Sequence, residues 1–261
     1  MSYDQVEVLH TFATEWGVSY DLLSDEGSEV IRRLGLLNAH VEAQQAFYGR
    51  GVDERHVGLP YPGTFVLDED GVVEQRLFDQ SYRPRPSAGY LFRAASGVPP
   101  EPARSATSTE GPVEVTAWLD SSYFRPLELR EVHVELRVAE PWHVYTDPIP
   151  DGFTALRVEV GADAAIATGQ ADLPAGRPFT VEGLPEQFHV VDGSVRVSVP
   201  FQLPGAGLDL DGRPLPEPGD PRPVALDVEV AHQACSDVEC LPPAVQRLRL
   251  EIDEGANVPR G

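Results

Sequence analysis

The two cysteines of the chain, Cys235 and Cys240, are separated by four residues in the segment HQACSDVECLPP, residues 232–243. A close pair of thiols can form a structural disulfide, supply part of a metal site, or cycle between a dithiol and a disulfide by exchange with other thiols. Each possibility implies a different function. The elements that hold the pair and the groups around it therefore decide what the chain does.

Alternating apolar and polar residues precede and follow the pair, in VALDVEVAHQA and LPPAVQRLRLEI. This pattern predicts a β-hairpin with residues 236–239 as its loop and the two cysteines facing each other at the strand ends. Opposed residues of an antiparallel pair have Cα atoms about 4.5 to 5.5 Å apart. A disulfide needs about 4.4 to 6.8 Å. We therefore expect that a disulfide can form here.

A disulfide between these cysteines closes a ring of only six residues. The loop-entropy relation gives about 2 kcal/mol for such a ring, against nearly 5 kcal/mol for a loop of about 100 residues. Because the hairpin already holds the strands together, a clip adds little stability. This favours an exchangeable disulfide and leaves the structural one open.

A metal site needs more ligands than the pair supplies. His232 is the nearby candidate, and one imidazole beside two thiolates leaves a tetrahedral site incomplete. We therefore expect no metal and interpret His232 as a strand residue. Asp237 and Glu239 lie between the cysteines, and carboxylates disfavour a thiolate. This environment therefore suits a disulfide that is attacked by a partner's activated thiolate better than a strongly nucleophilic cysteine that attacks a partner.

The hydrophobic spacing predicts two domains joined by a linker. Helices are predicted in residues 4–16, 28–36 and 86–96, a short strand in residues 18–25 and a hairpin in residues 63–78. These elements indicate an α/β domain over residues 1–96. Residues 97–112, rich in Pro, Ser and Thr, are the expected linker. Residues 113–253 alternate apolar and polar positions in short runs, typical of an all-β sandwich of the immunoglobulin type.

The composition excludes several classes of function. All 20 basic residues are Arg against 42 acidic residues, and the net charge of −22 disfavours nucleic acid and anionic membranes as partners. No apolar run is long enough for a membrane span, and no phosphate loop or zinc-protease motif occurs, so we expect no cofactor. The start, MSYDQVEVLHTF, has no signal-peptide pattern. No pattern specifies an oligomeric state.

Three segments of the second half carry a family resemblance: PWHVYTDP (141–148), EQFHVVDGSVRVSVPF (186–201) and ACSDVECLPP (234–243). Together they resemble the amino-terminal domain of the thiol:disulfide interchange reductase DsbD, an immunoglobulin-like module. The resemblance implies that Cys235 and Cys240 carry electrons from a membrane domain to thioredoxin-like partners outside the cytoplasm. It also implies a cap loop over the disulfide that bears Phe188, with Glu186 beside it. The gap between the cysteines is slightly shorter here than in one branch of the family.

The first half resembles the later part of an alkyl hydroperoxide reductase/thiol-specific antioxidant domain, which has a thioredoxin-like fold. The segments SYDQVEVLHTFA, YDLLSDEGSEVIRRLGLLN and GLPYPGTFVLDEDGVVEQRLF carry this resemblance. PYPGTFVLD matches the segment with that fold's cis-proline, which makes Pro62 the candidate. The family's catalytic cysteine lies in an earlier strand–helix unit, and no cysteine precedes Cys235. We therefore expect an incomplete thioredoxin-like domain without peroxidase activity in the chain as given.

The sequence thus predicts thiol–disulfide exchange through Cys235 and Cys240, as an electron relay that serves a redoxin-type system. The expected partner is a thioredoxin-like protein or another thiol–disulfide exchange protein. Two alternatives remain: a non-catalytic binding module with a structural disulfide, and a peroxiredoxin-like protein whose catalytic segment is missing from this chain. The resemblance implies a location outside the cytoplasm, whereas the chain as written has no export signal and is expected to stay where it is made.

Overall fold

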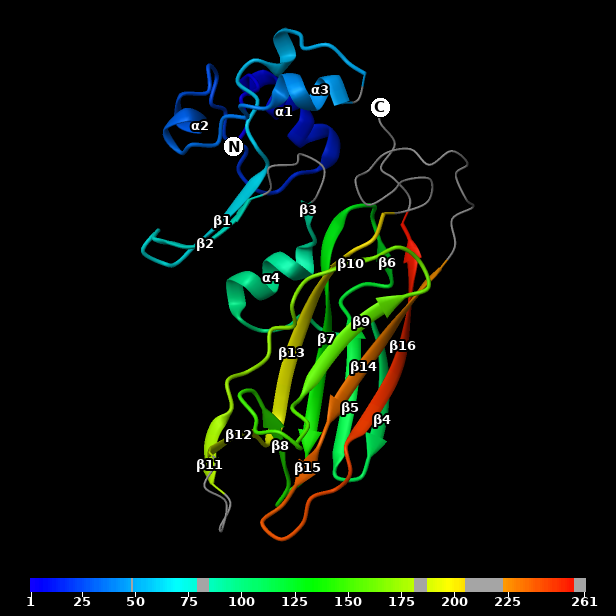
Figure 1. Cartoon of the computed structure of the whole chain (residues 1–261). Helices are drawn as coiled ribbons and strands as arrows, with labels where there is room; N and C mark the ends of the chain where they lie inside the picture. Colours follow the sequence, from blue (N-terminus) through cyan, green and yellow to red (C-terminus); the bar gives the residue numbers. More distant parts are fainter. Residues whose placement is uncertain (48, 79–84, 181–186, 205–222, 256–261) are drawn as a thin grey trace. The chain divides into compact units, whose positions relative to one another are not determined.

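The computed structural model describes residues 1–47, 49–78, 85–180, 187–204 and 223–255. The chain divides into two compact units, Met1–Tyr82 and Arg83–Gly261, each of which is described by itself (Figure 1). Within the described residues, none of the helices combines the length and the apolar character needed to cross a membrane.

The first unit contains helices and one hairpin. The elements are α1 (Val6–Trp16), α2 (Glu29–Arg33), α3 (Val41–Phe47), the 3-10 helix η1 (Glu54–His56) and the antiparallel pair β1 (Gly63–Leu67) and β2 (Val73–Phe78). The predicted helices and hairpin are present. Among the described residues, the strand predicted in residues 18–25 is present only as a single bridge between Ser2 and Ser24.

Hydrogen bonds define two local features of this unit. The turn of the hairpin is an Asx turn, in which Asp68 Oδ1 accepts hydrogen bonds from the backbone N–H groups of Asp70 at 3.0 Å and Val72 at 2.8 Å. Helix α1 begins without a capping box between Asp4 and Glu7. Its N-cap residue is Gln5, which makes no side-chain cap, and the Asp4 carboxylate instead accepts a hydrogen bond from the Ser2 hydroxyl.

The first unit buries little apolar surface. Ile31 and Val41 are its only buried apolar side chains among those described. Helix α1 buries none of its residues, and its Val6, Phe12 and Trp16 are exposed. An amphipathic helix normally covers its apolar stripe against a neighbouring element. The small core agrees with the expectation of an incomplete α/β domain.

The second unit is rich in β-structure, with one additional helix. The large sheet has the strand order β10 (Ala167–Thr168), β13 (Gly193–Gln202), β7 (Glu128–Val138), β5 (Val113–Leu119) and β4 (Arg104–Glu110), with β3 (Arg85–Pro86) also pairing with β7. A second sheet has the order β6 (Tyr123–Phe124), β16 (Ala244–Glu254), β14 (Val224–His232) and β9 (Arg157–Ala162). A third has the order β11 (Arg177–Thr180), β12 (Gln187–Val191), β8 (His143–Thr146) and β15 (Ala234–Cys235).

One apolar core joins these sheets. Strands β5, β7 and β13 contribute to it from the large sheet, and β9, β14 and β16 from the second, through side chains such as Val134, Val197, Leu226 and Leu250. Every second residue of these strands points into the core, as the alternation in the sequence predicts. The alternating runs of the second half therefore form strands, and two layers with a shared core make a sandwich.

The segment between the two predicted domains is more ordered than a linker. Residues 104–110 form β4, which pairs with β5 from Arg104–Leu119 to Glu110–Val113. Helix α4 (Ala88–Ser96), predicted to close the first domain, lies in the second unit. The Ser87 hydroxyl caps it by accepting from the Tyr90 N–H at 3.1 Å.

Helix α4 is held to β7 by buried polar groups. Arg93 Nε donates to Glu131 Oε2 at 2.7 Å, and Arg93 also pairs with Asp172 at 3.2 Å. Glu131 is 2% exposed. On the same outer face of β7, His133 Nδ1 lies 2.9 Å from Ser198 Oγ. This face is polar because α4, rather than the main core, covers it.

Burial of His133 predicts a pH-dependent stability. Burial lowers the pKa of His133 from 6.5 to about 4, with smaller effects of Arg93 and Arg130 in the same direction and of Asp120 against it. Between pH 6.5 and 4 the unfolded chain binds a proton that the folded chain does not, so stability falls as the pH falls. From pH 7 to pH 5, the full chain should lose roughly 2 kcal/mol more of unfolding free energy than a His133→Gln variant.

Urea unfolding followed by far-ultraviolet circular dichroism at both pH values measures this difference. Comparison with the variant removes the contribution of the carboxylates, which titrate in both chains. Parallel losses in the two chains would contradict the assignment of a neutral, buried His133.

Candidate functional site

The cysteine pair lies where the β14–β16 hairpin opens. These strands pair as far as His232 and Ala244. Beyond that point the chain crosses to the third sheet, where Ala234 pairs with Val144 and Cys235 pairs with His143. Cys235 and Cys240 form an isolated antiparallel bridge, their Cα atoms are 4.1 Å apart, and a disulfide joins them. The two cysteines face each other as predicted. However, Cys235 lies on a strand that pairs with β8 rather than with β16.

Hydrogen bonds give the loop a fixed shape. The Ser236 N–H donates to the Glu239 carbonyl at 2.8 Å, and the Ser236 hydroxyl accepts from the N–H groups of Val238 and Glu239, each at 3.3 Å. Below the disulfide, the Leu241 N–H donates to the Ala234 carbonyl at 2.9 Å. The pair is therefore held on a preformed turn on both sides of the sulfur–sulfur bond.

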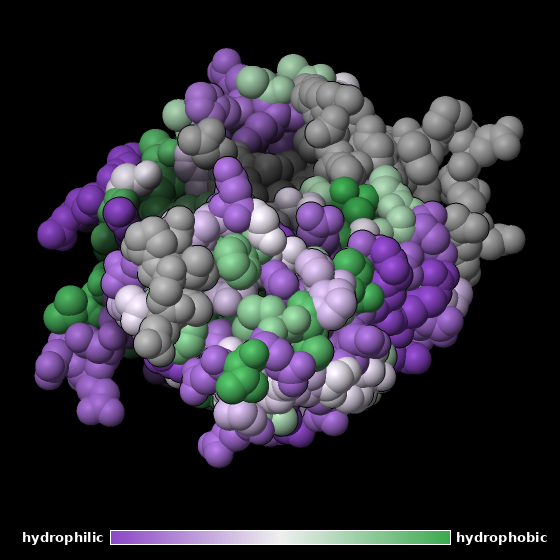
Figure 2. All heavy atoms as spheres, turned by 60° about the horizontal axis from the view of Figure 1, so that its bottom comes forward, coloured by the Kyte–Doolittle hydropathy of each residue, from purple (hydrophilic) through white to green (hydrophobic). Residues whose placement is uncertain are grey.

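The two sulfur-bearing residues differ in exposure. Cys235 is 0% exposed, whereas Cys240 belongs to the exposed residues of the loop, together with Asp237, Glu239 and Val238, which is 90% exposed. In Figure 1 this loop forms the lower end of the second unit, and Figure 2 turns that end forward, where apolar and hydrophilic side chains are interspersed. Of the two cysteines, only Cys240 lies at the surface.

The strand alternation explains why Cys235 is buried. Val144 and its partner Ala234 belong to the main core. Their neighbours His143, Tyr145 and Cys235 must therefore lie on the opposite face of the third sheet. On that face Cys235 belongs to a second apolar cluster with Tyr145, Phe188 and Val190, against which Ile149, Phe153 and Phe179 pack.

Aromatic rings form most of this second cluster. The centroid of the Phe188 ring lies 5.2 Å from that of Tyr145 and 5.0 Å from that of Phe153. The Tyr145 hydroxyl lies 3.7 Å from Cys240 Sγ. Burial raises the pKa of Tyr145, which keeps the hydroxyl protonated and able to donate a hydrogen bond to the sulfur. The sequence had not singled out Tyr145, because a tyrosine on a strand is usually a packing residue.

Of the two predicted cap residues, only Phe188 lies within the described residues. It is in strand β12, where it pairs with Phe179 of β11, and not in a loop. Its side chain is fully buried in the cluster that contains Cys235. Strand β12 pairs with β11 on one side and with β8 on the other, which places this segment inside the sheet. Glu186 lies outside the described residues.

Pro62 belongs to the first unit and does not have the expected peptide geometry. The cis peptide bonds of the described residues precede Pro141 and Pro148, and the Tyr61–Pro62 bond is not among them. The backbone runs extended here, from the bridge between Leu37 and Pro60 into β1. The Tyr61 N–H donates to the Leu36 carbonyl at 2.7 Å, and a trans peptide continues this path.

His232 has a structural partner. It ends β14, is 2% exposed, and its Nε2 accepts a hydrogen bond from the Gln246 amide at 3.0 Å. In the part of the chain that the structure describes, no group of three or more His, Cys, Asp or Glu side chains is arranged to hold a metal ion.

His143 is the titratable side chain directly opposite Cys235. It is 3% exposed, and its ring centroid lies 4.4 Å from that of Phe179 and 5.6 Å from that of Tyr145. Burial is the main cause of its lowered pKa, with Arg177 acting in the same direction and Asp237 and Asp192 opposing. Nothing in the sequence marks His143 as a site residue, because the sequence does not show which residue pairs with Cys235.

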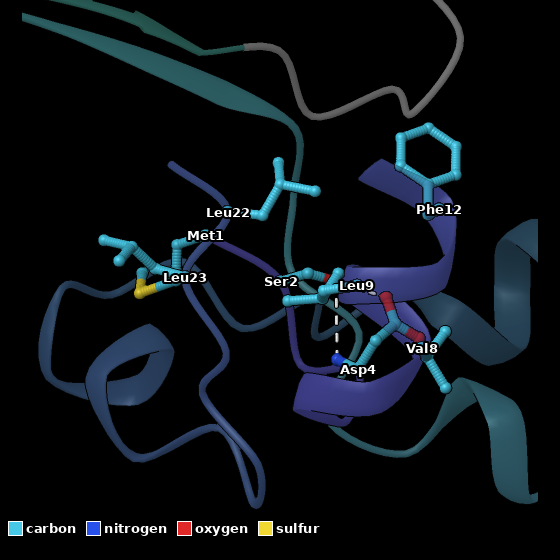
Figure 3. Close-up of a pocket in the computed structure, with 8 residues that line it drawn as sticks. All are labelled: Met1, Ser2, Asp4, Val8, Leu9, Phe12, Leu22 and Leu23. Carbon is cyan, nitrogen blue, oxygen red and sulfur yellow. Dashed lines mark hydrogen bonds between the residues drawn. The ribbon is translucent and has the colours of Figure 1, made fainter. Parts of the chain in front are cut away.

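A pocket of about 320 Å³ lies in the first unit, between α1 and the segment that contains Leu22 and Leu23 (Figure 3). Its lining is mostly apolar, with Leu9 and Phe12 on the helix and Asp4 as its one titratable side chain. Without a thiol, this pocket offers no exchange chemistry. The chemistry-bearing residues lie in the second unit.

Comparison with protein families matched two parts of the chain. The family described as thiol:disulfide interchange protein DsbD, N-terminal, matches residues 117–252. The AhpC/TSA family matches residues 1–76. Both resemblances noted in the sequence are thereby confirmed. Comparison with curated proteins gave no match.

Two solved structures are similar to parts of the chain. One is the DsbD N-terminal domain of Neisseria meningitidis in the reduced form, with 16% identity, a TM-score of 0.28, and coverage of 48% of this chain and 82% of that one. The other is the N-terminal periplasmic domain of ScsB from Proteus mirabilis, with 13% identity, a TM-score of 0.37, and coverage of 59% of this chain and 52% of that one.

The difference in exposure predicts unequal reactivity of the reduced cysteines. In the folded, reduced chain, iodoacetamide should modify Cys240 at least about tenfold faster than Cys235. The buried Cys235 thiol is inaccessible to the reagent, and burial disfavours the thiolate, which is the reactive form. Cleavage after Glu239 separates the cysteines into two peptides whose modification can be followed by mass spectrometry. The urea-unfolded chain, in which both should react alike, is the control. Equal rates in the folded chain would show that this asymmetry is absent from the reduced protein.

Proposed function

The chain belongs, through residues 117–252, to the family of the N-terminal domain of the thiol:disulfide interchange protein DsbD, and we propose that it relays electrons by thiol–disulfide exchange at Cys235 and Cys240. The observation that carries this proposal is the disulfide with one exposed member, Cys240, at the end of a rigid sheet. A disulfide that served only as a clip would need no accessible sulfur.

The exchange starts at Cys240. A thiolate of the reduced partner attacks Cys240 Sγ, the bond to Cys235 breaks, and its electron pair leaves on Cys235 Sγ as a thiolate that takes up a proton. A second partner thiolate then attacks the mixed disulfide at the partner's own sulfur and releases Cys240. The partner has formed a disulfide and the pair has gained two electrons. The reduced pair passes them on by the reverse sequence.

The surroundings of the pair support a passive disulfide attacked from outside. Asp237 and Glu239 lie between the cysteines on the exposed loop that holds Cys240 and work against a thiolate on Cys240, whereas the Tyr145 hydroxyl, 3.7 Å from Cys240 Sγ, can donate to it. The chain's net charge of −22 favours a partner with basic groups around its reactive thiol. Thioredoxin-like proteins are the class of partner that we propose.

The first unit has no thiol of its own, since both cysteines of the chain lie in the second. It therefore has no nucleophile for peroxide reduction. We propose that the unit similar to the AhpC/TSA family accompanies the exchange domain rather than carrying out peroxidase chemistry in the chain as given.

Single-cysteine variants test the direction of attack. The probe is a thioredoxin that retains one active-site cysteine, which is held as a mixed disulfide with thionitrobenzoate. Cys235→Ser keeps the exposed thiol and should form a covalent adduct with the probe. Cys240→Ser should do so at least about tenfold more slowly, because its thiol is buried. Release of thionitrobenzoate measures the rate, and a variant with both cysteines replaced by Ser gives the background. Faster coupling of Cys240→Ser would place the attack on the other sulfur.

The reduction potential tests whether the disulfide is exchangeable at all. After equilibration of the full chain in glutathione buffers, alkylation of the free thiols gives the fraction oxidised. We expect a midpoint above about −300 mV, the range of catalytic rather than structural disulfides. A pair that stays oxidised far below this potential would favour the binding module with a structural disulfide.

A further inference from the structure

We propose that His143 is the proton acceptor for Cys235 when the reduced pair closes again to a disulfide; this inference rests on the exchange proposed above for the same pair. His143 and Cys235 are directly opposed in the β8–β15 ladder. Because Val144 and Ala234 face the main core, His143 and Cys235 share the other face of the sheet. The side chains of opposed residues on one face have Cβ atoms about 4.5 to 5.5 Å apart.

The His143 ring has a polar atom without a partner. Its Nε2 is buried and makes no hydrogen bond, in a side chain that is only 3% exposed. Buried polar atoms are usually paired. Nδ1 of His189 and Nδ1 of His232 also lack a partner, but of these three imidazoles only His143 pairs with Cys235. A nitrogen that accepts a proton only during part of the reaction, when the neighbouring disulfide is reduced, would account for the missing partner of His143 Nε2.

The chemistry of closure requires such a base. Reduced Cys235 must lose its proton before it can attack, and its side chain is 0% exposed, so bulk water cannot take the proton. Burial also disfavours the thiolate. The buried Tyr145 hydroxyl is protonated and cannot serve as the acceptor.

The charged groups around His143 come from several elements. Arg177 of β11 pairs with Asp192 at 2.6 Å, so this carboxylate is already engaged. Asp237, on the loop between the cysteines, is exposed. Burial and Arg177 lower the pKa of His143, and the two carboxylates only partly oppose them. The imidazole is therefore neutral at neutral pH, with a lone pair available for a proton.

The step balances as follows. After Cys240 has formed a mixed disulfide with the partner, the proton of Cys235 Sγ–H moves to the His143 ring. The Cys235 thiolate attacks Cys240 Sγ, the internal disulfide forms, and the bond between Cys240 and the partner breaks. The electron pair leaves on the partner's sulfur, and His143 returns its proton to solvent or to that thiolate. The pair is oxidised by two electrons and the partner is reduced by two.

Ellman's reagent separates this step from the first attack. The reduced full chain should release thionitrobenzoate in two phases, the first from attack by Cys240 and the second from closure by Cys235. His143→Gln should slow the second phase at least about tenfold and change the first by less than about twofold. His133→Gln, which alters another buried histidine with a lowered pKa, is the matched control and should change neither phase.

The pH profile gives a readout that a structural role would not affect. With His143 as the base, the rate of the second phase in the unsubstituted chain should be nearly constant from pH 7 to 8. It should fall at pH values below the lowered pKa of the His143 ring. In His143→Gln it should rise about tenfold per pH unit, as for a thiol deprotonated by hydroxide. A parent rate that already rises in this way would overturn the proposal without any variant, even if the variant failed to fold.

The closure rate with Ellman's reagent and the coupling to the thioredoxin probe together distinguish this inference from the proposed function. A chain that closes its disulfide with the flat profile, and does not couple to the thioredoxin probe, would refute the electron relay and leave His143 as the base for closure. A second phase unchanged by His143→Gln in a chain that does couple to thioredoxin would refute only the role of His143.

Discussion

The pairing of β15 with β8 is the constraint on which the site depends. The hairpin of β14 and β16 belongs to one sheet, and at its end two residues, Ala234 and Cys235, cross to another. This crossing directs Ala234 into the main core and Cys235 to the opposite face. One cysteine is buried among aromatic rings and the other remains on an exposed turn. A hairpin that continued in its own sheet would not separate them in this way.

Much of the second unit could be predicted, because its information is local. Strands such as β7 and β14 bury alternate residues, and this period of two is visible in the sequence. The opposition of Cys235 and Cys240 follows from a short loop between two such runs. Spacing alone therefore predicted that a disulfide can form at the end of the hairpin.

The residues around the disulfide could not be predicted in the same way. Strand β8 is buried on both faces over His143–Thr146, so it shows no alternation that would mark it as a strand. Its pairing with Cys235 joins positions about 90 residues apart. The roles open to His143 and Tyr145 depend on that pairing, and so does the burial of Phe188 in β12, which sequence reasoning placed in a loop.

Helix α4 shows how a segment can join a unit other than the one its pattern suggests. The helix itself is local, with Ser87 as its cap, whereas its attachment depends on Arg93 and the distant Glu131. Residues 77–116 lie between the two ranges matched by family comparison, and they contribute β3, α4 and β4 to the second unit. Dissection of the protein for separate study should therefore cut ahead of Arg83. Division at residue 97 would strip a helix from the sandwich and leave the Glu131 carboxylate without its guanidinium.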